Sequence, residues 1–545
     1  MAQTLYSNAT ILTVDGNDRV VEAVLAEGGT IREVGSFAEV ESAAGPGATR
    51  RDLCGRTMIP AFIDPHGHFP DSGYLGLHRA DLSGPPIGDC RTLSEAFGRL
   101  RDRAAATPLG EWVIGVLFEP GGAAENRFPT RAELDAVSTD HPVWVIHFTG
   151  HAGVGNSLAL AARGVDRDTP DPAGGWLGRD PASGELTGLL KGMAAMGELG
   201  DSEFQVTYDR FRTAYRAAAD EYLSQGVALA QNAWATEALL GYFLRLAREG
   251  DAEIETLVLP AGFLEPDFTD GRLGLAPPAD GSGILLGPRK FFGDGSFHIQ
   301  TACITEPYYK PLNGEPGYCC PVSITREEMA RDIGRIHRMG YQCHIHANGD
   351  ATSDVILDAI EDVLAEDPRD DHRHTLIHTQ VLREDQLDRM MRLGVTASFF
   401  PAHLYYWGDF HRDVTFGPDR VRNICPTRWA VDRGMRFTIH NDAQVTPTRP
   451  LHLMWCAVNR SSVSGAVLGP EQALTPREAL RAHTIDAAWQ VFQDHTRGSI
   501  EPEKRADFAI LSGNPLDDPA EIRHIEVLET IVRGKTAYRH REQSA

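Results

Sequence analysis

The sequence has no long hydrophobic run. None of its apolar stretches approaches the roughly 20 residues that a membrane-spanning helix needs. The first stretch of the chain, MAQTLYSNATILTVDG, also lacks the basic segment and the apolar segment of a secretory signal peptide. These absences argue against an integral membrane protein and predict a cytoplasmic protein that has no membrane partner.

Cysteine is scarce as well. The 545 residues include eight cysteines, and no two of them have Cys-x-x-Cys spacing. A disulfide scaffold normally needs a much denser set of cysteines in a small secreted domain. We therefore expect most of these thiols to be small buried side chains in a reducing compartment.

Positive charge is in deficit. Lys and Arg number 52 against 76 Asp and Glu, which gives a formal net charge of −24. Nucleic acids and anionic membranes repel such a surface, so the composition argues against a nucleic-acid partner. The chain also has no low-complexity tract and no short-period repeat, and its hydrophobic content of 42% is ordinary for a globular protein with a large core.

Both ends of the chain are rich in short β segments. Near the N-terminus, residues 23–26 and 30–34 flank Gly28 and Gly29, which is a hairpin pattern. Residues 507–511 and 527–532 have the same character near the C-terminus. Two β-rich ends that enclose a different middle indicate one small sheet domain built from both termini.

The middle of the chain alternates helical patterns with apolar strands, which is typical of a parallel α/β architecture. The clearest unit begins at a capping box, Thr325 with Glu328, which starts a helix that runs to Gly340. A strand over residues 341–345 and a helix over residues 354–364 follow it. The same alternation continues through strands at 375–377, 395–399 and 435–439 and helices at 384–393 and 427–432.

The strongest local motif is Ile63-Asp-Pro-His66-Gly-His68, directly after an apolar run. Residues two apart in an extended strand face the same way, so His66 and His68 would aim two imidazoles at one point. Neutral imidazole is a preferred ligand of zinc. The alternative interpretation is a polar turn that contains two histidines by chance.

Four more residues stand at or just past the ends of other expected strands. They are Lys290, His346, His378 and Asp442. In α/β barrels the catalytic groups project from the C-terminal ends of different strands. Because all four are in register with the His-x-His pair, the set indicates one metal site more strongly than any member does alone.

On these residues the chain resembles the amidohydrolase superfamily, and specifically its amidohydrolase-3 branch, which includes N-substituted formamide deformylases. The matching stretches are Ile59-Pro-Ala-Phe-Ile-Asp-Pro-His-Gly-His68, Lys290-Phe-Phe-Gly-Asp-Gly-Ser296, His346-Ala-Asn-Gly-Asp350, His378-Thr-Gln380 and Gly498-Ser-Ile-Glu-Pro502. The resemblance implies a distorted TIM (β/α)8 barrel over residues 59–490. A small β-sandwich would be formed by residues 1–58 and 491–545 from both termini.

The resemblance also implies ligand roles. His66 and His68 would hold one divalent metal, zinc foremost, with Asp442 completing it, and His346 and His378 would hold a second. Lys290 matches the lysine that many relatives carry as N6-carboxylysine, which bridges two ions. An ammonium has no lone pair for a metal, so this role requires carboxylation or a lowered pKa. The alternative for Lys290 is a surface or salt-bridge lysine, and one ion remains an alternative to two because Ile377 stands where relatives carry glutamate.

The function expected from this set is metal-dependent hydrolysis of a non-peptide carbon–nitrogen bond in a small molecule: a linear amide, an N-formyl amine or an N-acyl amine. Asp442 would take a proton from the attacking water and return it to the leaving nitrogen. The alternatives are a cyclic-amide hydrolase or a deaminase on the same scaffold, and a catalytically silent homologue that acts as a binding protein. The lysine disfavours a deaminase, and the complete ligand set disfavours the silent homologue. Relatives are often oligomers, which implies a homo-oligomer such as a dimer.

Four histidines are candidates for substrate binding. They are His151, His298, His403 and His440. The alternative for His151 is a satisfied core histidine. The aromatic residues that flank His403 could wall a site for an apolar group or could simply pack. His440 could face the substrate or stand behind the metal ligands.

Three further histidines compete for attention. His344 is two residues from His346 and could share its face, although the family match favours His346. His372 and His374 belong to a charged segment, residues 369–374, and are expected to be exposed to solvent.

Overall fold

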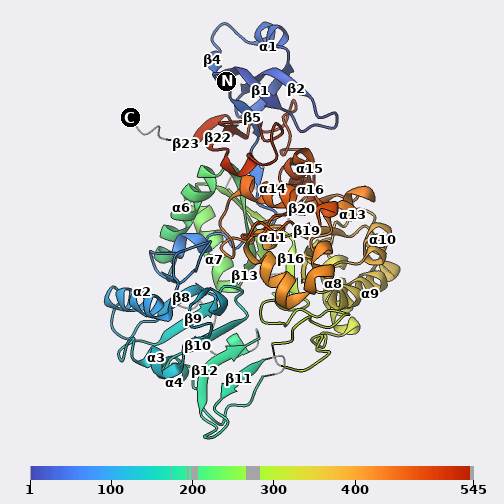
Figure 1. Ribbon diagram of the computed structural model, residues 1–545. Coiled ribbons are helices and arrows are strands. Elements are labelled where there is room, and N and C mark those ends of the chain that lie inside the picture. Colours follow the sequence, from blue (N-terminus) through green and yellow to red (C-terminus); the bar gives the residue numbers. More distant parts are fainter. Residues whose placement is uncertain are drawn as a thin grey trace.

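The computed structural model describes residues 2–172, 175–192, 195–197, 206–264, 283–312 and 314–540. Figure 1 shows three regions: a sheet at the top that contains both ends of the chain, parallel strands and helices in the middle, and a separate sheet below them. The expected α/β class is therefore confirmed.

The two ends of the chain are interleaved in one sheet. The strand order is β23 (Lys535–Arg539), β22 (Val527–Val532), β21 (Phe508–Leu511), β5 (Thr57–Pro60), β1 (Gln3–Leu12), β2 (Val20–Glu27) and β3 (Thr30–Gly35), with β4 (Thr49–Asp52) also on β1. The expected hairpin is the antiparallel pair β2–β3, and helix α1 (Phe37–Ala43) follows it. The described ladders give one sheet here and no second sheet facing it, so a sandwich is not confirmed.

The middle of the molecule contains two sheets of parallel strands. The first has the order β15 (Ile284–Leu286), β14 (Glu255–Pro260), β13 (Val227–Ala235) and β6 (Phe62–Ile63). The second has the order β16 (Arg289–Phe292), β17 (Cys343–Ala347), β18 (Thr375–His378), β19 (Thr396–Phe399) and β20 (Phe437–Ile439). A single parallel bridge between Ala261 and Lys290 connects them. Within the described ranges no ladder joins β20 to β6, so a closed barrel is not confirmed.

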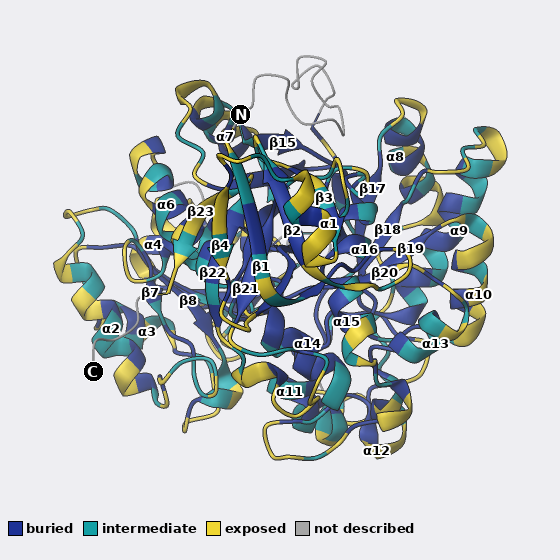
Figure 2. Ribbon diagram, turned by 90° about the horizontal axis from the view of Figure 1, so that it is seen from above, coloured by how far each residue is buried: buried dark blue, intermediate teal, exposed yellow. Residues whose placement is uncertain are grey.

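Helices cover the parallel strands. They include α6 (Tyr208–Ser224), α7 (Glu237–Glu249), α8 (Arg326–Arg338), α9 (Asp350–Glu366), α10 (Glu384–Leu393), α13 (Thr427–Asp432), α14 (Pro450–Asn459), α15 (Pro476–Ala482) and α16 (Ile485–Gln490). Figure 2 shows buried strands with α8, α9 and α10 outside them and the exposed residues facing outward. The expected capping box is present, because Glu328 N donates to Thr325 Oγ1 and Thr325 N donates to Glu328 Oε2. One hydrophobic core joins helices and strands through fully buried residues such as Ile333, Ile345 and Ile356.

A fourth sheet is inserted between β6 and α6. Its order is β11 (Trp176–Arg179), β12 (Leu186–Lys191), β10 (Ala152–Gly155), β9 (Val143–His147), β8 (Val113–Phe118) and β7 (Ala80–Asp81), with helices α2 (Leu93–Ala105), α3 (Arg131–Asp135) and α4 (Ser157–Ala162). It has a core of its own that includes Leu82, Val113 and Val143. This sheet brings residues 144–151 to the mouth of the parallel strands, where they line the cavity described below.

The expectation that His372 and His374 are exposed is wrong. Their exposed fractions are 1% and 0%. Burial of the two rings is possible because their nitrogens form hydrogen bonds with backbone groups. His372 Nε2 lies 2.7 Å from Leu393 O, and Cys343 N donates to His374 Nδ1 over 3.0 Å. The charged neighbours in the segment carry the contact with solvent instead.

The cysteines agree with the composition. All eight cysteines are free thiols, and five of them are buried: Cys90, Cys303, Cys343, Cys425 and Cys456. A search of the described helices finds none with the length and apolar character needed to span a membrane.

Candidate metal centre

A cavity of about 590 Å³ opens where the parallel strands end. Its wall includes all six residues predicted as metal ligands: His66, His68, Lys290, His346, His378 and Asp442. The two histidines of the first motif follow β6, and the others stand in or just after β16, β17, β18 and β20. Because the carboxyl ends of parallel strands meet at one edge, residues almost 380 positions apart in sequence share one cavity.

The nitrogen and oxygen atoms of these side chains lie close together. Asp442 Oδ1 is 3.3 Å from His68 Nε2 and 3.6 Å from His66 Nε2. One ligand atom each from His66, His378 and Asp442 lies within 4.8 Å of the other two. His66 Nδ1 is buried and has no hydrogen-bond partner in the described part of the chain. Imidazole and carboxylate donors in this arrangement fit a zinc-like divalent cation.

The backbone at two of these residues is strained. His378 and Asp442 have φ angles of 75° and 52°, which residues other than glycine rarely adopt. Two backbone hydrogen bonds hold the segment after β20 against the first motif: Asp442 N donates to His66 O, and His68 N donates to Ala443 O. Such outliers persist where the surroundings over-determine them, and they are concentrated at functional sites.

Asp294 orients one of the histidines. Its Oδ1 atom lies 3.1 Å from His346 Nδ1, and both carboxylate oxygens accept backbone N–H groups, from Asn348, Gly349 and Cys303. The other ring nitrogen, His346 Nε2, lies 3.4 Å from Asn348 Nδ2 and is the one that would turn to a ligand. Asp294 belongs to the motif that begins at Lys290, and no role was predicted for it. Its place four residues after Lys290 was a usable signal.

His440 stands behind His378. Its Nε2 atom is 3.1 Å from His378 Nδ1, and its Nδ1 atom is 2.8 Å from Ser398 Oγ, which in turn accepts a hydrogen bond from Thr438. His440 is absent from the cavity wall. Of its two expected positions, the structure has the one behind the candidate ligands.

The sequence of this chain is similar to those of known proteins. A sequence profile of the amidohydrolase family matches residues 50–538. The chain belongs to the amidohydrolase family. It is 29% identical to N-substituted formamide deformylase from Arthrobacter pascens, over 99% of this chain and 98% of that protein. It is 31% identical to Protein LONG AFTER FAR-RED 3 from Arabidopsis thaliana, over 99% of this chain and 92% of that protein.

A solved structure has the same fold. It is that of an uncharacterized metal-dependent hydrolase from Pyrococcus horikoshii, with a TM-score of 0.75 and 24% identity over 95% of this chain and 99% of that chain. The overlap supports a common arrangement of strands and helices across nearly the whole of this amidohydrolase.

Burial sets the protonation of the site in this amidohydrolase. It lowers the pKa of Lys290 to about 7, although Asp442 acts in the opposite direction. Burial, and then Lys290, holds the pKa of His66 well below its usual value. Burial would raise the pKa of Asp442, but the hydrogen bond from His68 and the positive charges of His68, His440 and Lys290 together outweigh burial, and the pKa falls to about 2. The site therefore contains an ionised carboxylate and a lysine that is partly neutral near pH 7.

Lys290 is not a surface lysine. It is 1% exposed, and its Nζ atom lies 3.3 Å from His66 Nε2. The alternative of a surface lysine is therefore excluded.

The substrate-binding candidates separate into different places. His151 lines the cavity, with its ring centroid 5.9 Å from that of His346. His298 and His403 belong to a different buried cluster, and His344 lies in β17 outside the cavity wall. The aromatic wall comes from other residues than those around His403: Trp144, Phe148, Trp234 and Phe292.

Proposed function

We propose that this chain is a hydrolase that uses one or two divalent metal ions, zinc foremost, to cleave a non-peptide carbon–nitrogen bond in a small molecule. The observation that carries the proposal is that six side chains lie on the wall of one cavity: four histidines, one lysine and one aspartate. The cavity volume of about 590 Å³ is in the range of pockets that hold small molecules.

The candidate ligands divide into two groups. His66, His68 and Asp442 would hold one ion, and His346 and His378 a second. Lys290 would bridge them as N6-carboxylysine, which forms when a neutral amine attacks carbon dioxide and loses a proton. The lowered pKa of Lys290 supports this step because only the neutral amine is a nucleophile. A bound metal supplies a water of lowered pKa and polarises the substrate carbonyl.

Asp442 is the proposed proton carrier. Its low pKa keeps it ionised at neutral pH, so it can accept a proton from the attacking water. The contact with His68 holds the carboxylate at the cavity wall. Once protonated, Asp442 donates to the nitrogen of the breaking bond, because an amine leaves poorly without a proton.

The substrate we propose is a linear amide, most specifically an N-formyl or N-acyl amine with an apolar N-substituent. The Arthrobacter pascens relative, named as a formamide deformylase, supports the N-formyl class. The aromatic side chains of the wall, including Phe148 and Trp234, support an apolar substituent. His151 faces the same space, and burial lowers its pKa to about 4, so its neutral ring offers one N–H to a substrate oxygen.

A fold for the whole chain is also part of this proposal. We infer that the parallel strands close into a distorted (β/α)8 barrel over residues 59–490, with residues 1–58 and 491–545 as a separate β-sandwich. The hydrogen bonds of Asp442 and Ala443 with the first motif support closure between the ends of β20 and β6. A homodimer belongs to the same proposal, and its test is the mass of the purified protein in solution.

The test of the function is a substrate screen. Purified protein with a measured metal content is incubated with N-formyl amines, N-acyl amines, cyclic amides and aminopurines, with zinc added or with a chelator. The expected result is release of formate or a carboxylic acid from the linear amides only in the metal-loaded protein. Hydrolysis of cyclic amides or deamination instead would support the corresponding alternative, and inactivity of the loaded protein on every class would overturn the proposal.

A further inference from the structure

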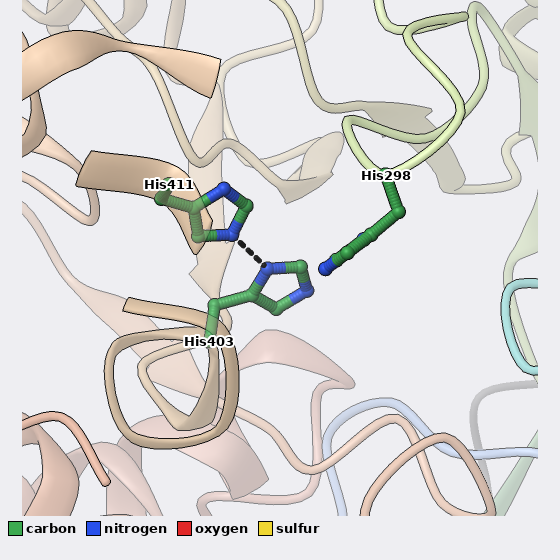
Figure 3. A group of neighbouring side chains, drawn as sticks. All are labelled: His298, His403 and His411. Atoms are coloured by element: carbon green, nitrogen blue, oxygen red, sulfur yellow. Dashed lines mark hydrogen bonds between the residues drawn. The ribbon is translucent and has the colours of Figure 1, made fainter. Parts of the chain in front are cut away.

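A second group of histidines lies outside the cavity of the candidate centre. His298 follows β16, His403 belongs to α11 (Ala402–Phe410), and His411 begins a π-helical turn, η4 (His411–Thr415). Figure 3 shows the three rings turned toward one another, with a hydrogen bond between His403 and His411. One ring nitrogen from each lies within 4.8 Å of the other two. Single π-turns of this kind are frequent at functional sites.

One nitrogen in this cluster has no partner. His298 is 8% exposed, and its Nε2 atom is buried without a hydrogen-bond acceptor or donor among the residues that the structure describes. Three of the other ring nitrogens have partners: His403 Nδ1 is 2.9 Å from His411 Nε2, and His411 Nδ1 is 3.1 Å from Thr415 Oγ1. Buried polar atoms are normally satisfied, so the unpaired nitrogen points to a missing ligand.

A second buried trio provides a comparison. The rings of His337, His372 and His374 are as close, with 4.3 Å between the centroids of His372 and His374. Backbone groups account for their outer nitrogens: His337 Nε2 is 2.9 Å from Asp367 O, and the two others bind Leu393 O and Cys343 N. That trio is a satisfied part of the core. The cluster at His298 differs because its free nitrogen faces two other rings.

We propose that His298, His403 and His411 bind a divalent cation of the zinc class, at a site separate from the candidate centre. Imidazole is a preferred ligand for such ions, and three histidines with one open position form a known zinc arrangement. The open position would face a second cavity of about 310 Å³, which His298 lines. This cavity supplies the entry path that a buried metal site requires.

The surroundings suit a cation. Glu119 lines the same second cavity and accepts a hydrogen bond from Trp407, whose ring lies 4.9 Å from that of His298.

The site would stabilise the wall of the larger cavity. The ring of Phe148, which lines that cavity, lies 4.7 Å from His298 and stacks on Trp407 at 4.8 Å. A cation at the cluster would join the segment after β16 to α11 and η4 directly behind this aromatic side chain. We therefore assign the cation a structural role and no part in bond cleavage.

The test uses crystals of the unaltered protein soaked in zinc and measured on both sides of the zinc absorption edge. An anomalous peak between the three rings supports the site. Absence of a peak there overturns it, whether or not the larger cavity contains zinc.

Metal analysis of variants provides a second readout. His298→Asn should bind one equivalent of zinc fewer than the unaltered protein, and His372→Asn, from the satisfied trio, should bind the same number. An unchanged zinc count in His298→Asn, or an equal loss in His372→Asn, would contradict the proposal. Loss of the zinc at the larger cavity alone bears on the proposed function and leaves the peak at the cluster unaffected, so the two proposals fail separately.

Discussion

Replacement of Asp294 by asparagine tests how the candidate centre is held in shape. The carboxylate accepts from His346 Nδ1 and Asn348 N on one oxygen and from Gly349 N and Cys303 N on the other. In Asp294→Asn one oxygen becomes an NH₂ group, so two of these donors lose their acceptor. Each buried donor left unpaired costs about 1–3 kcal/mol, so the free energy of unfolding should fall by about 2–6 kcal/mol.

The same change should weaken metal binding. Carboxylates that orient a ligating histidine contribute roughly 10–100-fold to metal affinity. Asp350→Asn is the matched control, because Asp350 also accepts from a backbone N–H, that of Thr305, and pairs with Arg383 without touching His346. Both variants should unfold at lower urea concentration, and only Asp294→Asn should bind zinc more weakly in a competition titration with a chromophoric chelator. Equal zinc affinity in Asp294→Asn and the unaltered protein would refute the orienting role.

Three further predictions concern the centre itself. Asp442→Asn should lower kcat by about 10²–10⁴-fold with an unchanged circular dichroism spectrum, and substantial remaining activity would contradict its role as proton carrier. In metal-free protein, the pKa of Lys290 is about 7 in the folded state, against an ordinary value of 10.5. The folded state therefore binds fewer protons between these two values, and the free energy of unfolding rises with pH across that window, by about 5 kcal/mol in total. Lys290→Met should flatten this rise in urea melts measured from pH 7 to 10, and an identical slope would exclude Lys290 as its source. Chelation should abolish hydrolysis and lower Tm, and restoration of both by zinc distinguishes metal loss from irreversible damage.

The sequence predicts elements best where local chemistry marks their ends. Helices α10 and α13 begin and end at the predicted residues, and Gly394, with φ of 69°, ends α10 in the left-handed conformation that glycine favours. Which terminal strands are neighbours, and whether the parallel strands close into a barrel, depends on contacts between distant segments, which no local pattern encodes. The exposure of His372 was mispredicted for a similar reason: the charge of its segment was visible, and the carbonyl that its ring binds was not.

For the site, the strand ends together with the family motifs were enough to name the six candidate ligands. The supporting contacts were not predictable from spacing. The positive φ of Asp442 follows from hydrogen bonds to a segment near residue 66, and the position of His440 behind His378 depends on the register of two neighbouring strands. No sequence motif marks His411. Only the packing of α11 and η4 against the segment after β16 brings its ring to His298.

The interleaved terminal sheet has a consequence for assembly of the protein. Strand β5 lies between β1 and β21, and it runs almost directly into β6 and the first two candidate ligands. A growing polypeptide that has reached residue 490 holds every candidate ligand, yet one side of β5 still lacks its neighbour, which arrives only with residues 508–511. The cost of closing so long a loop comes before its contacts form, which is typical of slow folding. A nascent chain that stops before β21 therefore leaves one edge of β5 unpaired, a few residues before the first two candidate ligands.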